Sequence, residues 1–372
     1  MIIKSLELLD YRNYHRLQMN FDRGTNILYG DNAQGKTNIL ESIYVCATTK
    51  SHRGSRDREM IRFDQEESHI RLFIERDAIE HKIDIHLKRN KTKGAAIDGI
   101  PIKKSSELMG MLNVVFFSPE DLTIIKNGPA ERRHFIDMEL CQLNRVYLHD
   151  ISNYNKVVSQ RNNLLKQSWY QESLKSTLDV WDEQLVRYGI RVIKEREKFI
   201  RQLNELIRPI HSKLSGGKEV LELRYEPGVT EEAFEETLFM RRENDLKLKT
   251  TSVGPHRDDM GFYIDNINVR KYGSQGQQRT AALSLKLAEI DLVKLFIKDT
   301  PVLLLDDVLS ELDSFRQNYL LESISRIQTV ITCTGLDEFI NNRFNIDKVF
   351  KVKDGSIENQ QQEVKNERYD FE

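Results

Sequence analysis

A glycine-rich segment joins a short apolar run at 26–29 to a helix-like stretch. Glycines at both ends, in the spacing Gly-x-x-x-x-Gly-Lys-Thr, let backbone N–H groups approach an anion, to which the following helix adds its positive dipole end. Lys36 would place its charge on the β- and γ-phosphates of a nucleotide, and Thr37 its hydroxyl on Mg²⁺. An ordinary glycine turn is the alternative. The segment that predicts a phosphate site is Gly30, Asp31, Asn32, Ala33, Gln34, Gly35, Lys36, Thr37 and Asn38.

A second apolar run ends in two neighbouring carboxylates. Residues 301–305 are typical of a buried strand, and Asp306 and Asp307 follow directly. Carboxylates are costly there unless they serve a cation. We predict that Asp306 reaches the Mg²⁺ that Thr37 contacts, and that Asp307 orients or deprotonates a water molecule aimed at the γ-phosphate. Taken alone, the pattern is more typical of a strand that leaves its sheet, but the upstream phosphate segment favours the metal site.

A third segment, Ser274, Gln275, Gly276 and Gln277, opens a strongly helical stretch. A serine at a helix start caps backbone N–H groups, and the first-turn N–H groups attract anions. In isolation an ordinary helix cap is the better interpretation. The order of the three segments, with Asp313 after the carboxylates, resembles that of ABC-type ATPases and favours a second anion site.

Length and composition restrict the function classes. A chain of 372 residues is longer than one ordinary domain, so we predict two domains. One domain could be inserted in the other. The sequence has no apolar run near the ~20 residues needed to span a bilayer, and its start does not resemble a signal peptide. We therefore expect a soluble cytoplasmic protein with no membrane partner. The three cysteines lack metal-ligand spacing and are expected in the core. With a net charge of −2, any DNA contact must come from local patches.

The remaining pattern divides into strand-rich ends and a helical middle. Apolar residues recur at helical spacing from Arg133 to Leu165, which predicts one long helix, and from Trp181 to Ile210, which predicts its antiparallel partner. We interpret both stripes as core. Another helix is expected at 275–298. Expected strands are 2–9, 15–21, 68–76, 80–88, 92–97, 100–103, 113–117, 219–225, 260–269, 302–305 and 329–334, with a hairpin at 349–358.

Five separated blocks give the chain a specific resemblance. They lie at 118–122, 128–137, 254–259, 274–280 and 305–313, and together they resemble the RecF family of DNA replication and repair proteins over the whole chain except its polar tail. One departure is Asn127, where the family usually has glycine.

The resemblance implies an α/β fold, the ABC-type ATPase head shared with SMC proteins. This is a P-loop NTPase with a mixed sheet, helices and an antiparallel β-subdomain, and with an inserted helical lobe that carries a short helical hairpin. The expected parts are an ATPase lobe at 1–118 and 299–357, a helical lobe at 119–298 with its hairpin at about 131–215, and a polar disordered tail at 358–372.

The family's shared ATP site is expected here between two copies of the chain. Residues 30–38 and Asp306 of one copy would bind ATP and Mg²⁺, while 274–277 of the other copy would cover the γ-phosphate. Asp313 is also expected in this site, and Lys36, Asp306, Asp307 and Ser274 are the expected catalytic group.

The resemblance also implies the partners. These are double-stranded DNA and gapped DNA with single-strand junctions, the proteins RecR and RecO, indirectly RecA, and a second copy bound through ATP, in a nucleoid-associated cytoplasmic setting with a role in the SOS response. Basic segments at 50–58 and 88–93 could contact DNA, although such runs are usually solvated. Arg132 and Arg133 could equally pair with acidic residues of the fold.

Two departures from transporter-type ABC ATPases predict slow hydrolysis, which we also expect DNA to stimulate. Asp307 stands where those enzymes have glutamate, and Thr332-Cys333-Thr334 stands where they have a histidine. Three alternatives remain open: a transport ATPase subunit, a nuclease with an SMC-like head, and a clamp that binds ATP without hydrolysing it. For a nuclease, Asp258-Asp259 is the other acidic pair near a plausible core.

Overall fold

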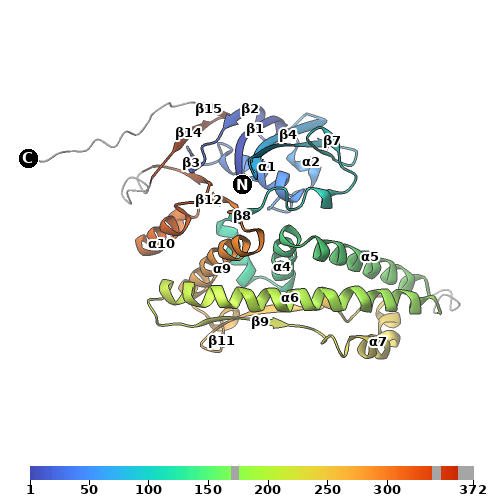
Figure 1. Cartoon of the computed structure of the whole chain (residues 1–372). Coiled ribbons are helices and arrows are strands. Elements are labelled where there is room, and N and C mark those ends of the chain that lie inside the picture. Colours follow the sequence, from blue (N-terminus) through green and yellow to red (C-terminus); the bar gives the residue numbers. More distant parts are fainter. Residues whose placement is uncertain (169–175, 337–344, 359–372) are drawn as a thin grey trace, which may run out of the picture. The chain divides into compact units, whose positions relative to one another are not determined.

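The computed structural model describes residues 1–168, 176–336 and 345–358. The chain divides into two compact units (Figure 1). Unit 1 comprises Met1–Pro119 and Val293–Glu372, and unit 2 comprises Glu120–Leu292. The chain therefore leaves unit 1, builds unit 2 and returns. The polar tail predicted at 358–372 lies, apart from Glu358, outside the described residues.

Unit 1 contains a mainly parallel sheet with the strand order β15-β14-β3-β13-β12-β8. Strands β8, β12 and β13 are buried along their whole length, as expected for apolar runs in a parallel sheet. Because β3, β12 and β13 are parallel, their carboxyl ends meet at one edge. The strands are β3 (Thr25–Tyr29), β8 (Val114–Phe117), β12 (Val302–Asp306), β13 (Thr329–Cys333), β14 (Lys348–Lys353) and β15 (Ser356–Glu358).

An antiparallel sheet with the order β2-β1-β4-β5-β6-β7 completes unit 1. Helix α1 (Lys36–Thr48) contacts strands of both sheets, and its apolar residues belong to the core cluster that the two sheets share. Helices α2 (Asp57–Met60) and α10 (Ser314–Ile324) also belong to this unit. The strands are β1 (Ile2–Tyr11), β2 (Tyr14–Asn20), β4 (Glu67–Arg76), β5 (Ile79–Lys88), β6 (Gly94–Ile97) and β7 (Ile100–Pro101).

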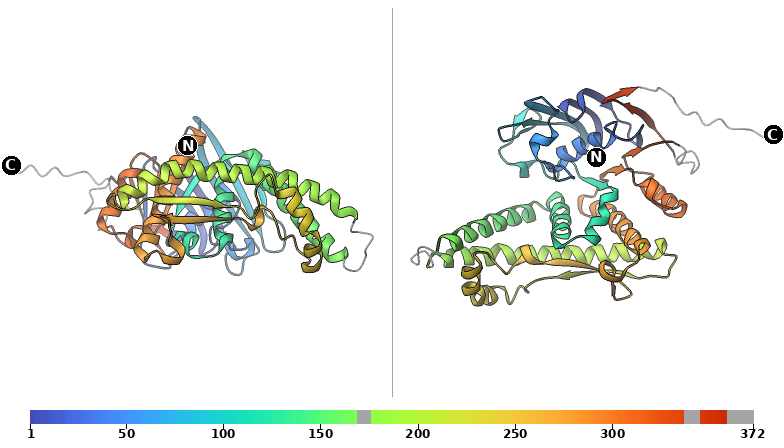
Figure 2. Two further views of the ribbon diagram at one scale, coloured as in Figure 1. Left: turned by 90° about the horizontal axis from the view of Figure 1, so that it is seen from below. Right: turned by 180° about the vertical axis from the view of Figure 1, so that it is seen from behind.

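Unit 2 is built on a helical hairpin of α5 and α6, which the two apolar stripes predicted (Figure 2). Strand β9 packs along α6 in the three-stranded antiparallel sheet β11-β10-β9. The elements are α3 (Leu122–Lys126), α4 (Pro129–Leu143), α5 (Arg145–Ser168), α6 (Leu178–Leu214), β9 (Leu221–Glu226), α7 (Phe234–Leu248), β10 (Asp259–Ile264), β11 (Ile267–Asn268), α8 (Val269–Tyr272) and α9 (Gln275–Ile297), whose last turn belongs to unit 1.

The prediction of one helix from Arg133 to Leu165 is wrong. The chain breaks at Asn144, whose backbone is extended with φ −135° and ψ 105°. Its side-chain oxygen accepts hydrogen bonds from the N–H groups of Val146 at 2.9 Å and Tyr147 at 3.1 Å. Asn144 therefore caps a new helix, although the apolar spacing in the sequence runs across the break.

Two further differences lie in unit 2. The strand predicted at 260–269 ends at Ile264, because Asp265 and Asn266 turn the chain with positive φ angles of 49° and 67°. Helix α7 was not predicted. It is mostly polar, and the apolar residues that it buries are only Phe234, Leu238 and Leu246, too few for a clear helical stripe.

None of the described helices combines the length and the apolarity that crossing a membrane requires.

Candidate nucleotide site

The glycine-rich loop between β3 and α1 depends on its glycines. Gly30 has φ 149° and Gly35 has φ 108°, values that side chains disfavour. A Cβ on Gly30 would collide with the carbonyl oxygen of Val352, and one on Gly35 would lie 2.5 Å from Asn13 Nδ2. Helix α1 begins directly after Gly35, so its first N–H groups face the concave side of an anion loop.

Lys36 is folded into this loop. Its ammonium group donates to the carbonyl oxygen of Gly30 and, at 2.8 Å, to that of Asp31. Burial lowers the pKa of Lys36, and the nearby carboxylates of Asp307 and Asp306 act in the opposite direction. The only side-chain cation of the loop is therefore held where bound phosphate oxygens would replace the carbonyls.

The two predicted metal ligands are in direct contact. Thr37 Oγ1 donates to Asp306 Oδ1 at 2.7 Å, although the residues lie 269 positions apart. Such a pair of oxygens, a hydroxyl and a carboxylate beside a phosphate loop, is the donor set that Mg²⁺ prefers. The structure thus brings together the first two sequence-predicted segments.

Thr332 completes this arrangement and was not predicted as a site residue. Its hydroxyl donates to Asp306 Oδ1 at 2.7 Å and accepts from the Asp307 N–H at 3.0 Å. It can do so because β12 and β13 pair Asp306 with Thr332. Asp307 has a left-handed φ of 51°, so this pairing supports an unfavourable backbone conformation at the proposed catalytic carboxylate.

Two turns far from the loop in sequence brace it. Asn13 Nδ2 donates to the carbonyl of Gln34 at 2.9 Å, and the Tyr14 hydroxyl donates to that of Gly35 at 3.0 Å. The N–H of Asp354, between β14 and β15, donates to Gln34 Oε1 at 2.5 Å. In the sequence, Asn13 and the Asp354-Gly355 pair are typical of turns. Neither pattern indicates that its turn contacts the glycine-rich loop.

Arg12 holds the first of these turns in place. Its guanidinium donates to both carboxylate oxygens of Glu41 in α1, at 2.6 and 2.7 Å. Although burial opposes the change, the hydrogen bonds from Arg12 and from Ser51 lower the pKa of Glu41. Arg12 and the following Asn13 are therefore fixed against the helix that carries Lys36.

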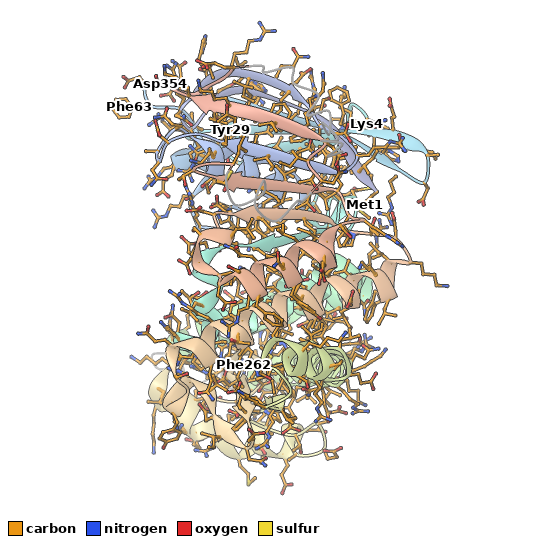
Figure 3. All side chains as sticks on the ribbon, turned by 90° about the vertical axis from the view of Figure 1, so that its left-hand side faces the viewer. Met1, Lys4, Tyr29, Phe63, Phe262 and Asp354 are labelled. Atoms are coloured by element: carbon orange, nitrogen blue, oxygen red, sulfur yellow. The ribbon has the colours of Figure 1, made fainter. Side chains whose placement is uncertain are left out.

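A hollow of about 970 Å³ opens beside the start of α1. Asn13 and Asn38 line its loop side. The rest is lined by four arginines, two carboxylates and three other side chains, namely Arg12, Arg58, Arg62, Arg89, Glu59, Asp64, Ile61, Phe63 and Gln65. Phe63 is 85% exposed and is labelled on unit 1 in Figure 3. An exposed aromatic ring among arginines beside a phosphate loop suits a planar base with anionic groups attached.

The two basic segments predicted separately lie together. Lys93 of the second segment donates to Asp57 Oδ1 at 2.9 Å and to the carbonyl of Thr49. Arg53 of the first segment donates to Asn38 Oδ1 at 3.5 Å. The segments 50–58 and 88–93 thus meet at the Lys93–Asp57 ion pair, and Arg53 connects the first of them to Asn38 at the start of α1.

The third predicted segment begins α9 in unit 2. Ser274 Oγ accepts from the Gln277 N–H at 3.2 Å, and Gln277 Oε1 accepts from the Ser274 N–H at 2.9 Å, a reciprocal capping box. Gln277 Nε2 donates to Glu219 Oε1 at 2.9 Å. The other oxygen of Glu219 lies 3.2 Å from Nε2 of the buried His211 in α6. Ser274, Gln275 and Gly276 remain exposed.

Asp313 also caps a helix. Its carboxylate accepts from the Arg316 N–H at 3.0 Å at the start of α10 and forms an ion pair with the Arg316 guanidinium. The hydrogen bond from the Arg316 N–H lowers the pKa of Asp313. No contact between Asp313 and the phosphate loop is recorded among the described residues.

The remaining acidic pair is structural. Arg132 donates to both oxygens of Asp259 at 2.6 and 2.9 Å, and Arg133 donates to the carbonyl of Asp258 at 2.7 Å. Asp258 also accepts from the Tyr225 hydroxyl. In the part of the chain that the structure describes, neither carboxylate belongs to a group of three or more potential metal ligands.

Comparison with known proteins gives a consistent result. The family model "RecF/RecN/SMC N terminal domain" matches residues 2–358. "DNA replication and repair protein RecF" of Lachnoclostridium phytofermentans is 64% identical over 358 residues, 96% of this chain and 99% of that protein. The protein of the same name from Clostridium botulinum strain Okra is 48% identical, covering 91% of this chain and 94% of that protein.

Solved structures agree. "Structure of the recombination mediator protein RecF-ATP in RecFOR pathway" matches with a TM-score of 0.88 and 36% identity, covering 96% of this chain and 98% of that one. An SMC head bound to the C-winged helix domain of ScpA matches with a TM-score of 0.56 and 17% identity over 96% of both chains, a likeness of fold alone. The predicted α/β head fold with its helical insertion is confirmed.

Proposed function

The chain belongs to the RecF family, and from this premise we propose that it is an ATP-dependent DNA-binding protein of replication and recombinational repair. The observation that carries the proposal is the contact between Thr37 and Asp306 beside the enclosed Lys36, because it assembles a phosphate loop and a magnesium carboxylate in one unit. The relative whose structure is described as RecF-ATP supports ATP as the nucleotide.

In this proposal ATP enters with its phosphates in the loop at 30–38 and its nucleoside in the hollow that Phe63 lines. Lys36 exchanges the carbonyls of Gly30 and Asp31 for phosphate oxygens. Thr37 and Asp306 would hold Mg²⁺, and the ion would supply positive charge to offset that of the phosphates. Asp307 orients the attacking water.

We propose further that two copies close on the nucleotide. The exposed helix start at 274–277 is held by its own capping side chains, which leaves the Ser274 hydroxyl hydrogen and the N–H groups of Gln275 and Gly276 to face an anion. A γ-phosphate held in the loop of another copy fits that chemistry. The division into an ATPase lobe and a helical lobe, with the boundaries expected above, and a contribution of Asp313 to the shared site are part of this proposal.

DNA and protein partners follow from the family. The two basic segments at 50–58 and 88–93 are our candidate for contacts with DNA phosphates. They meet at the Lys93–Asp57 ion pair, and they concentrate lysines and arginines in a chain whose net charge is −2. The proposed protein partners are RecR and RecO. With them the protein would help to load RecA onto gapped DNA and would support SOS induction. The proposed location is the nucleoid-associated cytoplasm. A transport ATPase subunit or an SMC-like nuclease is the alternative.

The decisive experiment measures DNA binding with and without ATP on duplex, single-stranded and gapped DNA, with particle mass recorded in parallel. We expect ATP to double the mass and to strengthen binding to duplex and gapped DNA. A protein that stays monomeric with ATP and binds none of the three DNA substrates would overturn the proposal. Steady-state assays should show slow hydrolysis that DNA accelerates, and rapid turnover without DNA would contradict the switch role.

Thr332→Val should slow hydrolysis about 3- to 10-fold with little change in ATP affinity. The valine keeps the shape of the strand but removes a hydroxyl that bonds Asp306 and the Asp307 N–H, interactions each worth about 0.5–1.5 kcal/mol. Single-turnover hydrolysis checks this. Thr332→Ser, which keeps the hydroxyl, is the matched control and should behave like the parent chain, while equal rates for both variants would refute the assigned role.

Glu219→Ala should weaken ATP-dependent self-association about 3- to 10-fold. Glu219 accepts the side-chain hydrogen bond of Gln277, and without it the capping box at the helix start is less restrained. Sedimentation in the presence of ATP measures the effect. Glu219→Gln retains an acceptor oxygen and should restore most of the association, and unchanged association in the alanine variant would show that Glu219 does not position this segment.

A further inference from the structure

The outer face of strands β4 and β5 carries a cluster of imidazole and carboxylate groups. Along β4 the side chains alternate between buried and exposed positions, with Ser68 and Ile70 in the core and Glu67 and His69 on the solvent side. His86 of β5 pairs directly with His69 across the antiparallel ladder. Since side chains two apart on a strand share a face, these three potential ligands project from one rigid surface.

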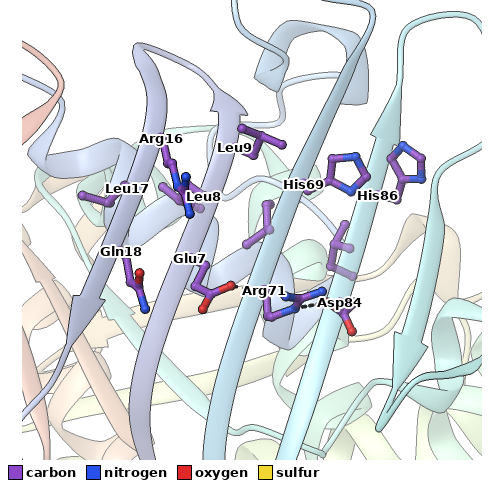
Figure 4. Close-up of a pocket in the computed structure, with 12 residues that line it drawn as sticks. Glu7, Leu8, Leu9, Arg16, Leu17, Gln18, His69, Arg71, Asp84 and His86 are labelled. Atoms are coloured by element: carbon purple, nitrogen blue, oxygen red, sulfur yellow. Dashed lines mark hydrogen bonds and ion pairs between the residues drawn. The ribbon is translucent and has the colours of Figure 1, made fainter.

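Their geometry is close. The rings of His69 and His86 stack with centroids 4.0 Å apart and an interplanar angle of 22°. His86 Nε2 lies 2.7 Å from Glu67 Oε2, and one ligand atom from each of the three residues lies within 4.8 Å of the other two. Figure 4 shows the two histidines side by side on the same sheet face.

We propose that Glu67, His69 and His86 bind a divalent transition-metal ion, with Zn²⁺ as the reference ion. Two imidazoles and one carboxylate suit Zn²⁺, Ni²⁺ or Cu²⁺, whereas Mg²⁺ and Ca²⁺ prefer oxygen ligands alone. With metal–ligand bonds of about 2.0–2.2 Å, tetrahedral ligand atoms lie about 3.3 Å apart. Side-chain rotations of the exposed groups close the difference without moving the strands.

The surroundings permit the ion. Burial lowers the pKa of His69, and the neighbouring His86 acts in the same direction. A cation near Glu67 could compete with a metal ion for its carboxylate. The Nζ atom of Lys88 lies 4.0 Å from Glu67 Oε1. The next cation along β4, Arg71, is held by Asp84 at 2.6 Å and by Glu7 at 3.3 Å.

The site is separate from the candidate nucleotide site. A hollow of about 440 Å³ adjoins the histidines, so water can fill the coordination positions that the protein leaves open. All three cysteines of the chain are buried and do not compete. An ion held by both strands would cross-link β4 to β5 and stabilise unit 1 by binding the folded state alone.

The test titrates Zn²⁺ into the full chain, prepared without a histidine tag, by calorimetry and by competition with a fluorescent chelator. The parent chain should bind one equivalent and show a higher melting temperature with Zn²⁺. His69→Ala and His86→Ala should each weaken binding by at least about tenfold, since each removes one of three ligands. His81→Ala is the matched control, because His81 is another β5 histidine that pairs with a carboxylate, Asp98.

Further arms make the result unambiguous. Excess Mg²⁺ should not displace Zn²⁺, and lowering the pH from 7.5 to 5.5 should release it as the imidazoles take up protons. Circular dichroism should show that the exposed-site variants remain folded. Equal Zn²⁺ affinity in the parent, His69→Ala and His86→Ala chains, or an equal loss in His81→Ala, would overturn the proposal.

Discussion

Lys36→Ala is expected to weaken ATP binding about 10- to 100-fold. The ammonium group is the loop's one side-chain cation, and hydrogen bonds to charged groups are worth about 1.5–3 kcal/mol, which converts to this range. Fluorescence titration with an ATP analogue checks the affinity. ATP-dependent self-association should be lost at the same ATP concentration.

The control for this result is Lys104→Ala. Lys104 is exposed and does not line the hollow beside the loop, so its loss removes a charge without removing a described contact of the site. The Lys36 variant should keep its fold, because Gly30 and Asp31 offer their carbonyls to water when the ammonium is gone. ATP affinity in Lys36→Ala equal to that of the control would refute the assignment of this loop.

Ser274→Arg should abolish ATP-dependent dimerisation while leaving ATP binding by the monomer intact. The arginine removes a helix cap worth about 1 kcal/mol and places a long side chain where the γ-phosphate of another copy must approach. Because the proposal assigns Ser274 to the nucleotide site of another copy, the substitution should leave the monomer's own phosphate-loop contacts unchanged. Light scattering with ATP measures the association.

ATP affinity must be measured at a protein concentration where the parent chain is monomeric, because dimerisation itself would raise the apparent affinity. Ser274→Ala separates the loss of the helix cap from the steric effect of the arginine. It removes the cap without adding bulk, so it should weaken the dimer less than Ser274→Arg. A dimer that persists in Ser274→Arg would rule out the shared-site proposal, whereas loss of ATP binding by the monomer would place Ser274 in its own nucleotide site.

Much of the candidate site was predictable because its determinants are local. Gly30 and Gly35 are required by the backbone angles of a few consecutive residues, and the capping box joins Ser274 to a residue three positions later. Asp306 ends an apolar strand that is recognisable by composition. The error at Asn144 also had a local cause, since a side-chain cap can interrupt a helix without interrupting its apolar spacing.

The family was predictable from the amino-acid sequence, and so were the glycine-rich loop and the apolar strand that ends in carboxylates, because each depends on short segments. The tertiary structure alone decided which distant segments meet. Thr332 reaches Asp306 through the register of two parallel strands, Asn13 and Asp354 brace the loop from separate hairpins, and His86 faces His69 across a ladder. Strand register and sheet order depend on packing of the whole core, which no short segment encodes.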